Sequence, residues 1–342
     1  MSAEADIAAC REAIRHGSKS FHAASFLLPR RMREDALALY AFCRLADDAV
    51  DLQEAKVSAV LDLGARLDAI YAGRPHDDPA DRAFARVVER HEMPRGLPDA
   101  LLEGFAWDAE ARAYRTLSDV RAYSARVAAA VGAMMAVLAG NREKGTLARA
   151  CDMGVAMQLT NIARDIGEDA RMGRIYIPLD WLAEAGIDPD ALIADPAPTP
   201  ELRHVTARLL AEAERLYRRA MPGIAHLPRQ HRMAMIACRH IYGAIGSEIA
   251  RAGHDSVTTR AHTGPGRKIG LLSRSICEAA VMAIAPKPLT TDRPLPETAF
   301  LVDIAARTAP SAGEERLDRI LDIFADLKRR EAAARSQGIA AE

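Results

Sequence analysis

The sequence predicts an all-helical protein. Alanine and leucine are abundant, aromatic residues make up only 5% of the chain, and the alternation of apolar and polar residues typical of strands is nearly absent. Clusters of proline and glycine separate segments whose apolar residues recur at helical spacing. These breaks are short and flanked by apolar helices, so none of them resembles a flexible domain linker. We therefore expect one domain of packed helices.

The proline and glycine clusters define the expected helices in chain order. The helices span residues 4–16, 31–51, 57–71, 80–91, 97–113, 118–140, 144–169, 179–185, 200–220, 229–252, 267–283 and 313–335. Residues 1–312 are expected to form a single helical domain, and residues 313–342 a C-terminal amphipathic helix and tail. That last helix would either dock on the body or mediate association through one apolar face, formed by Leu317, Ile320, Leu321, Ile323, Phe324 and Leu327.

Charge and cysteine content exclude several functional classes. A formal net charge of -1 and a pI near 6.8 provide no overall attraction to nucleic acid, which is therefore not an expected partner. The five cysteines are scattered and include no Cys-x-x-Cys pair. This distribution indicates free thiols in a reducing compartment and gives no sign of a zinc site.

The N-terminus and the longest apolar run bear on location. Residues 1–15 alternate charge with alanine and lack the apolar core of a secretory signal, so we expect a cytoplasmic protein. The run from Val127 to Gly140 has 14 residues, fewer than the roughly 20 that span a bilayer, and we interpret it as a core helix lining a cavity. An apolar patch around a cavity entrance would still allow peripheral contact with the inner membrane.

Two short acidic clusters are the most informative feature of the chain. Asp47 and Asp51 enclose the first, and Asp165 and Asp169 enclose the second. Residues four apart share one face of a helix, so each pair presents two carboxylates to the same space. Carboxylate oxygens suit Mg²⁺, or Mn²⁺ in its place, which bridges a few carboxylates to the phosphates of a substrate. The clusters therefore predict a diphosphate substrate held through a divalent cation.

The ordinary explanation of a single acidic pair is a solvated helix face. Here the residues that precede the clusters, 36–43 and 153–160, are apolar on most faces, so both helices are expected to be buried. Carboxylates at the ends of buried helices need partners. Arg44 and Arg164 lie next to the clusters, and each could hold a phosphate or orient a carboxylate.

A polar stripe extends the second cluster. Gln158, Asn161, Asp165 and Asp169 follow one another at spacings of 3, 4 and 4 along an otherwise apolar helix. An ordinary hydrogen bond between helices would explain either amide alone. Beside two aspartates, Asn161 is a sensible oxygen ligand for the same metal.

Further candidates lie elsewhere in the chain. Arg260 follows the second cluster at a distance in sequence and precedes a Gly-Pro loop, where it could close over a second diphosphate, and Tyr242 lies in a predicted helix. A helix cap rich in serine would explain the segment just after the first helix, but its composition also suits anion binding. That segment consists of Ser18, Lys19, Ser20 and Phe21.

Three segments resemble the signature regions of the phytoene and squalene synthase family. They are SKSFHAASFLLP (18–29), LYAFCRLADDAVD (39–51) and MQLTNIARDIGEDARMGRIYIP (157–178). The motifs occur in the family's order, and the resemblance covers roughly residues 8–290. The stretch GHDSVTTR (253–260) is most similar to bacterial 15-cis-phytoene synthases of carotenoid pathways.

The resemblance implies a catalytic domain with an isoprenoid-synthase-type helical bundle around a central apolar cavity. The implied enzyme is a prenyltransferase that condenses two geranylgeranyl diphosphates head to head, through prephytoene diphosphate, to phytoene and diphosphate, without NADPH. Enzymes before and after it in the pathway would be further partners. The implied metal ligands are Asp47, Asp51, Asn161, Asp165 and Asp169. The implied substrate contacts are Ser18, Lys19, Ser20, Phe21, Arg44, Gln158, Asn161, Arg164 and Arg260.

One stretch departs from the family pattern. Where members commonly carry a sequence like YCxxVAGxVG, this chain reads YSARVAAAVG (123–132), and Tyr123 and Tyr242 are its candidates for steering the cation rearrangement. The implied chemistry also needs an apolar wall that keeps water from an allylic cation. Core packing would explain any one of the wall candidates, which are Met134, Met135, Val137, Leu138, Met153, Val155 and Met157, with Ala128, Ala129, Ala130 and Gly132 leaving room for two chains.

Three alternatives stay open at this point. An enzyme of the same fold could make squalene, dehydrosqualene or hydroxysqualene from farnesyl diphosphate. A non-catalytic assembly factor would be expected to have lost acidic positions, and a terpene cyclase using one diphosphate is disfavoured by the second cluster. The sequence contains no glycine fingerprint for a dinucleotide, which favours phytoene over squalene.

Overall fold

The computed structural model describes residues 2–17, 25–52, 56–285, 288, 290 and 293–307, and for residues 15–17, 45–52, 56–58 and 265 it describes the backbone alone. Every regular element in these ranges is helical, so the predicted all-helical class is confirmed. The helix expected over 313–335 and the domain boundary at 312 lie outside the described residues and stay predictions.

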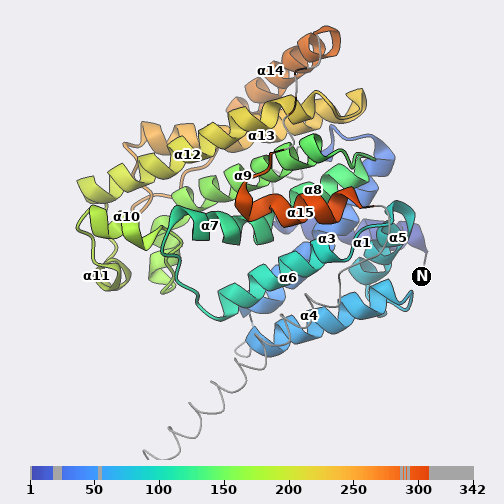
Figure 1. Ribbon diagram of the computed structural model, residues 1–342, viewed down its shortest axis with the longest axis horizontal. Helices are drawn as coiled ribbons and strands as arrows, with labels where there is room; N and C mark the ends of the chain where they lie inside the picture. The colour runs from blue at the N-terminus through green and yellow to red at the C-terminus, as the bar shows by residue number, and fades with distance from the viewer. Residues whose placement is uncertain are drawn as a thin grey trace, which may run out of the picture.

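The helices form a layered bundle, with α12 and α13 on one side and α4 and α6 on the other (Figure 1). Their bounds are α1 (Ala3–Gly17), α3 (Arg30–Leu52), α4 (Lys56–Tyr71), α5 (Pro79–His91), α6 (Gly96–Ala109), α7 (Leu117–Ser124), η1 (Ala125–Ala129), α8 (Ala130–Leu138), α9 (Lys144–Arg171), α10 (Leu179–Glu184), α11 (Pro189–Ala194), α12 (Pro200–Ile224), α13 (Arg229–Arg251), α14 (Pro265–Ile284), η2 (Pro296–Thr298) and α15 (Ala299–Ala306).

Helix α9 occupies the centre of the fold. It packs against α8, η1, α12, α13 and α15, and its 28 residues extend over about 42 Å. Leu147, Cys151, Val155 and Leu159 recur every four residues and are completely buried. The apolar sequence that precedes the second acidic cluster is therefore the core of the molecule, as predicted from its composition.

Most expected helices agree with the structure to within a few residues, and the exceptions have local causes. The helix expected to run to residue 113 ends at Ala109, because Ala111 takes a left-handed conformation with φ of 50°. The short helices α11 and α15 were not predicted, since prolines surround both and suggested loops. In α11, Asp188 caps the helix by accepting a hydrogen bond from the amide of Asp190, and Pro189 begins it.

The helix expected over 118–140 contains a π-helical turn. Residues 125–129 form η1, in which the amide of Ala130 donates to the carbonyl of Ala125, five residues earlier. Gly154 on α9 faces this turn, and a Cβ added there would lie 2.6 Å from the Cα of Ala129 and 2.7 Å from the carbonyl oxygen of Ala128. Only glycine permits so close an approach of the two backbones.

The longest apolar helical stretch is mostly buried, and the cysteines are not paired. One stretch among the described residues, Leu117–Leu138, is long and apolar enough to cross a membrane by length and composition, but 61% of its apolar window is buried inside the structure. This agrees with the prediction of a core helix. The five cysteines are free thiols, as expected.

The contact between α9 and η1 predicts that Gly154→Ala destabilises the protein. The added methyl group would force the two backbones apart at a cost of about 1–3 kcal/mol. Urea denaturation followed by circular dichroism measures this change in the free energy of unfolding. Gly64→Ala is the matched control, because Gly64 lies inside α4 with nothing within 4 Å of an added Cβ, and there the change should be neutral or stabilising. Equal stability of the two variants would contradict the prediction.

Candidate active site

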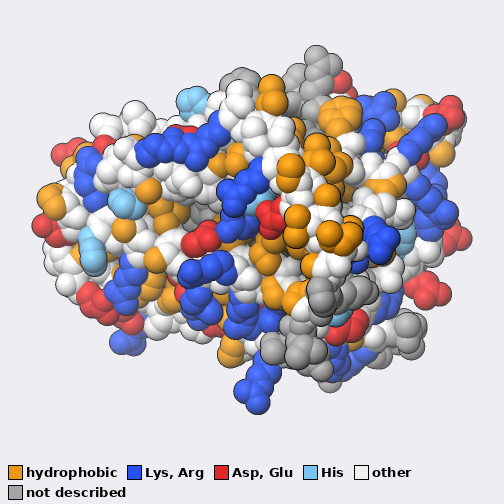
Figure 2. Space-filling view, turned by 90° about the horizontal axis from the view of Figure 1, so that it is seen from above, with side chains coloured by type: hydrophobic (Ala, Val, Ile, Leu, Met, Phe, Trp, Pro, Cys, Tyr) orange, Lys and Arg blue, Asp and Glu red, His pale blue; other side chains and the backbone are white. Residues whose placement is uncertain are grey.

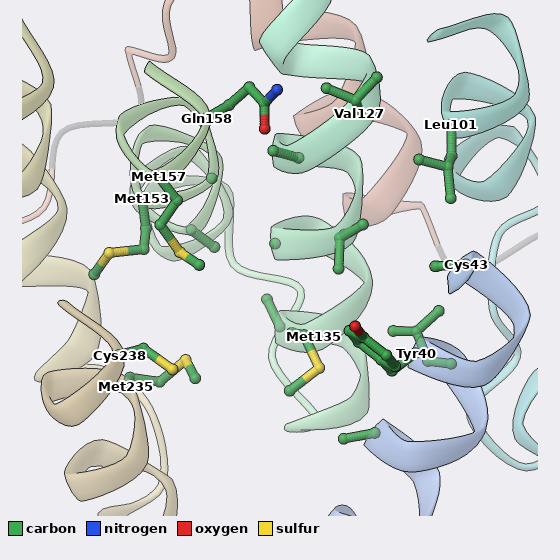
Figure 3. A pocket seen from close by; sticks show the side chains of 18 of the residues that line it. Tyr40, Cys43, Leu101, Val127, Met135, Met153, Met157, Gln158, Met235 and Cys238 are labelled. Atoms are coloured by element: carbon green, nitrogen blue, oxygen red, sulfur yellow. The ribbon is translucent and has the colours of Figure 1, made fainter. Parts of the chain in front are cut away.

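A cavity of about 410 Å³ lies between α3, α8, α9 and α13. Its walls are mainly apolar, and each of these helices contributes a stripe of residues at helical spacing (Figure 3). Seven sulfur-bearing side chains line it, and all four helices contribute at least one; they are Met32, Cys43, Met135, Met153, Met157, Met235 and Cys238. The predicted central apolar cavity is therefore present.

The cavity has a polar end and a mainly apolar far end. On α9 its lining runs from Thr146 to Asn161, fifteen residues apart, which corresponds to about 22 Å along the helix. The residues that line the polar end are Arg44, Asp108, Tyr123, Gln158, Asn161 and Tyr242. Those at the far end are Met32, Ala139, Thr146, Leu227 and His231.

The first acidic cluster follows the polar end of the cavity on α3. Arg44 lines the cavity, and the helical backbone continues through Asp47 and Asp51 on the next turns. The side chains of residues 45–52 are not described, so the roles of these aspartates stay predictions. The same holds for four predicted substrate contacts that lie outside the described residues, Ser18, Lys19, Ser20 and Phe21.

Two arginines hold Asp165, the first residue of the second cluster. Arg164 donates to both carboxylate oxygens at 2.7 and 2.6 Å, and Arg260 donates to the same oxygens at 2.8 and 3.2 Å. Burial by itself would raise the pKa of Asp165, but the hydrogen bonds from the two guanidinium groups outweigh it and keep the pKa below its ordinary value. Arg164 and Arg260, which were both predicted to contact phosphate, therefore bind the same carboxylate.

Gly167, inside the second cluster, explains how Arg260 reaches this carboxylate. A Cβ at Gly167 would lie 2.6 Å from the Cα of Val257, and the Gly167 amide donates to the carbonyl of Ser256 at 3.0 Å. Arg171 adds a hydrogen bond of 2.8 Å to the carbonyl of Val257. The absence of a side chain at Gly167 thus lets the segment after α13 lie directly on α9.

Asp169 differs from Asp165 although it lies on the same face of α9. Burial, and next the negative charge of Asp165, raise its pKa from 3.8 to about 7. No hydrogen bond or ion pair to its carboxylate is found among the described residues. A half-buried carboxylate beside a second one is a position where a bound cation would restore the charge balance.

The polar stripe of α9 reaches from the cavity to these aspartates. Gln158 and Asn161 both line the cavity, and the Asn161 amide lies 3.4 Å from the Gln158 side-chain oxygen. Within the described part of the chain, no three His, Cys, Asp or Glu side chains gather closely enough to hold a metal by themselves. The donors fit a cation only if the aspartates of α3, whose side chains are not described, complete the set.

Asp108 is a site residue that the sequence analysis missed. It lines the polar end of the cavity and accepts hydrogen bonds from the hydroxyls of Tyr123 at 2.9 Å and Tyr176 at 2.8 Å. Burial, and next the charge of Asp108, raise the pKa of both tyrosines. The available signal in the sequence was an acidic residue placed directly after the apolar stretch Gly104–Trp107 of α6.

The cavity uses only one face of each wall helix, which corrects the predicted wall. Met135, Met153 and Met157 line it, together with Ala128 and Gly132. Four other candidates are buried but point to other parts of the core, because they lie on different faces of their helices; these are Met134, Val137, Leu138 and Val155. Ala129 and Ala130 are buried away from the cavity as well.

The sequence matches the family model for squalene/phytoene synthase over residues 14–267. The chain belongs to the squalene/phytoene synthase family. A phytoene synthase from Rhodobacter capsulatus is 56% identical, with 99% of each chain covered. A phytoene synthase from Cereibacter sphaeroides is 54% identical, with 96% of this chain and 95% of the relative covered.

Solved structures of the family share the fold. A dehydrosqualene synthase superposes with a TM-score of 0.75 at 28% identity, covering 82% of this chain and 98% of that one. The squalene synthase HpnC from Alicyclobacillus acidocaldarius gives a TM-score of 0.68 at 26% identity, covering 74% and 96%. The family fold expected from the signature motifs is thereby confirmed.

The raised pKa of Asp169 predicts that Asp169→Asn stabilises the metal-free enzyme at pH 8. With a folded-state pKa near 7 against 3.8, ionisation of Asp169 opposes folding by at most about 4 kcal/mol. Because the folded state binds this proton more tightly than the unfolded chain, protonation of Asp169 stabilises the fold fully below about pH 4. This stabilisation is lost as the pH rises through 7. Thermal denaturation in EDTA should therefore show a higher Tm for the variant at pH 8 and a smaller difference at pH 5.

Asp62→Asn is the control for this variant, because Asp62 is an exposed aspartate on α4, away from the acidic cluster. It should change the Tm little at either pH. A Tm difference for Asp169→Asn that does not depend on pH would contradict the assigned ionisation.

Proposed function

We propose that this chain is a phytoene synthase, which condenses two molecules of geranylgeranyl diphosphate head to head, through prephytoene diphosphate, to phytoene. The observation that carries the proposal is the identity of 54–56% to relatives of that name along nearly the whole chain. A third relative, a 15-cis-phytoene synthase from a Paracoccus species, is 46% identical. The chain is thus a prenyltransferase of carotenoid biosynthesis, and the alternative of a non-catalytic assembly factor is not favoured.

The length of the cavity supports a C20 substrate. With an advance of about 1.2 Å for each carbon–carbon bond of about 1.5 Å, the fifteen bonds along the main chain of a geranylgeranyl group extend over about 18 Å and the eleven of a farnesyl group over about 13 Å. The cavity stripe on α9 spans about 22 Å between Thr146 and Asn161. A farnesyl chain would leave the far end unfilled, which disfavours the enzymes that use farnesyl diphosphate.

The polar end of the cavity is built to receive diphosphate. Arg44, Arg164 and Arg260 supply positive charge there, and the apolar walls keep water from the allylic cation that forms when diphosphate leaves. Asp108 fixes the hydroxyl of Tyr123 at the same end, next to the place where the reacting carbons would lie. Tyr242 also lines the cavity, and we assign to both tyrosines the role of guiding the rearrangement.

The proposed cofactor is Mg²⁺, with Mn²⁺ as a substitute. The carboxylate of Asp169, which has no hydrogen-bond or ion-pair partner among the described side chains, fits a cation beside Asp165, and Asn161 adds an amide on the same helix. Bound by these residues together with Asp47 and Asp51, the metal would neutralise the charge of the leaving diphosphate. We propose that the reaction needs no NADPH and takes place in the cytoplasm.

The proposal predicts the product and its dependence on the aspartates. Purified enzyme with geranylgeranyl diphosphate and Mg²⁺ should form phytoene, identified by mass spectrometry, and should do so without NADPH. Asp47→Ala and Asp165→Ala should each lower kcat about 100-fold or more, because each removes a contact that stabilises the departing charge. Circular dichroism should show an intact helical fold.

Asp62→Ala is the matched control, since Asp62 is an exposed aspartate on α4, away from the cavity lining. Near-normal turnover in either site variant would refute the assignment of that aspartate. A C30 product formed only from farnesyl diphosphate would refute the proposed substrate.

The far end of the cavity predicts how chain length can be changed. Ala139→Phe would place an aromatic ring among Met32, Leu227 and His231, shortening the space for the prenyl tail. The kcat/KM for geranylgeranyl diphosphate should fall about 10-fold or more, with that for farnesyl diphosphate retained. Competition between the two substrates measures this ratio. Ala139→Val should give a smaller change in the same direction, whereas an equal loss with both substrates would indicate general damage and contradict the prediction.

A further inference from the structure

Helix α14 presents an uncovered apolar face. Ile269, Ile276, Val281 and Ile284 are 66%, 54%, 63% and 88% exposed, which makes them four of the six exposed large hydrophobic residues found among the described side chains. They recur at spacings that place them along one side of the helix, over about 22 Å. Isolated apolar residues on a surface are ordinary, but a stripe of this length on one helix indicates an interaction surface.

The arrangement of the helices leaves this face open. α14 lies outside α13, at the edge of the molecule, and α13 is its main neighbour among the described elements (Figure 1). Figure 2 looks onto this side and shows uncovered hydrophobic side chains gathered near its middle, with Lys and Arg side chains, and also Asp and Glu side chains, at their edge. The other side of α14 is tied to the body, since His240 on α13 is paired with Glu278 at 2.7 Å.

The charges around the stripe are positive. Arg274 is exposed on α14, Lys268 lies one turn from its beginning, and Arg229 reaches the other end, where it donates to the carbonyl of Ala283 at 3.4 Å. Glu278 is the acidic residue of α14, and it is half-buried against His240 on the side of the helix that faces the body. An apolar stripe bordered by cations is complementary to a surface that offers hydrocarbon below and negative charge above.

We infer that the exposed face of α14 docks the enzyme on an anionic lipid bilayer. The helix would lie in the plane of the interface, with Ile269, Ile276, Val281 and Ile284 in the acyl region and the cations at the headgroups. The biological reason for docking rests on the proposed function. Phytoene is a hydrocarbon without polar groups and has to pass from the enzyme into a membrane. The docking itself does not require turnover.

A lipid surface fits the face better than a protein partner does. The stripe follows a single helix whose one acidic residue, Glu278, is half-buried against the body, so α14 offers no exposed acidic group to pair with its cations across an interface of two copies. Lysine and arginine near a bilayer surface each contribute about 1 kcal/mol of attraction to anionic lipid. Binding should therefore depend on the headgroup charge as well as on the apolar side chains.

Vesicle flotation of the full-length enzyme without substrate tests the inference. The wild type should float with vesicles of phosphatidylcholine and phosphatidylglycerol, and less with phosphatidylcholine alone. The double variant Ile276→Asp/Ile284→Asp should bind vesicles at least about 10-fold more weakly than the wild type. Its kcat in detergent should be unchanged, because neither residue lines the cavity. Met172→Asp is the matched control, since Met172 is 56% exposed at the end of α9. It should bind vesicles like the wild type.

The exposed thiol of Cys277 provides a native probe of the same face. Three of the other cysteines are buried, so a Cys277→Ser variant supplies the background rate of labelling with a maleimide. Cys277 should react rapidly in the free enzyme and become protected when anionic vesicles are added. Protection without vesicles would show that another segment of this chain covers the face, and protection that rises with protein concentration would show a second copy. Either result would overturn the inference, as would equal flotation of the wild type and the double variant.

Absence of vesicle binding by an enzyme that still makes phytoene would refute the docking alone. Absence of phytoene synthesis by an enzyme that binds vesicles would refute the proposed function alone. The two proposals are thus separated by measurements on the same preparation.

Discussion

A central helix that is apolar for most of its length and acidic at one end imposes the main constraint on this structure. The first turns of α9 are buried against its neighbours, whereas Asp165 and Asp169 at its end carry charge that burial disfavours. The structure resolves the conflict at Asp165 with two guanidinium groups. The described side chains offer no such partner to Asp169, and this is the reason we propose a cation at that position.

The loop between α13 and α14 depends on the same constraint. Arg260 reaches Asp165 only because Gly167 lets residues 256 and 257 lie against α9. A residue without chemistry of its own thereby controls the electrostatics of the acidic cluster. In the cavity, a carboxylate serves as the partner of neutral groups. Asp108 brings a charge to the polar end of an otherwise apolar space and accepts hydrogen bonds from two buried tyrosine hydroxyls there.

The sequence was sufficient for the features that depend on helical periodicity. Burial of the segment before Asp165, the role of residues 127–139 as a cavity wall and the joint stripe of Gln158 and Asn161 all follow from spacing along one helix. Features that depend on which faces meet were not accessible in this way. Asp108 becomes a site residue only when α6 and the residues near Tyr176 come together, and Val155 is buried away from the cavity although it looks equivalent to Met153 in the sequence.

The π-helical turn η1 determines which side chains of the wall helix face the cavity. A turn closed five residues back holds one residue more than an α-helical turn, so the helix leaves η1 with its faces rotated by about 100° relative to an uninterrupted α-helix. Deleting one residue from the alanine-rich stretch would preserve a good helix while turning Val131 and Met135 away from the prenyl space. Evolution in this segment is therefore free to exchange small side chains for one another but is bound to keep their number.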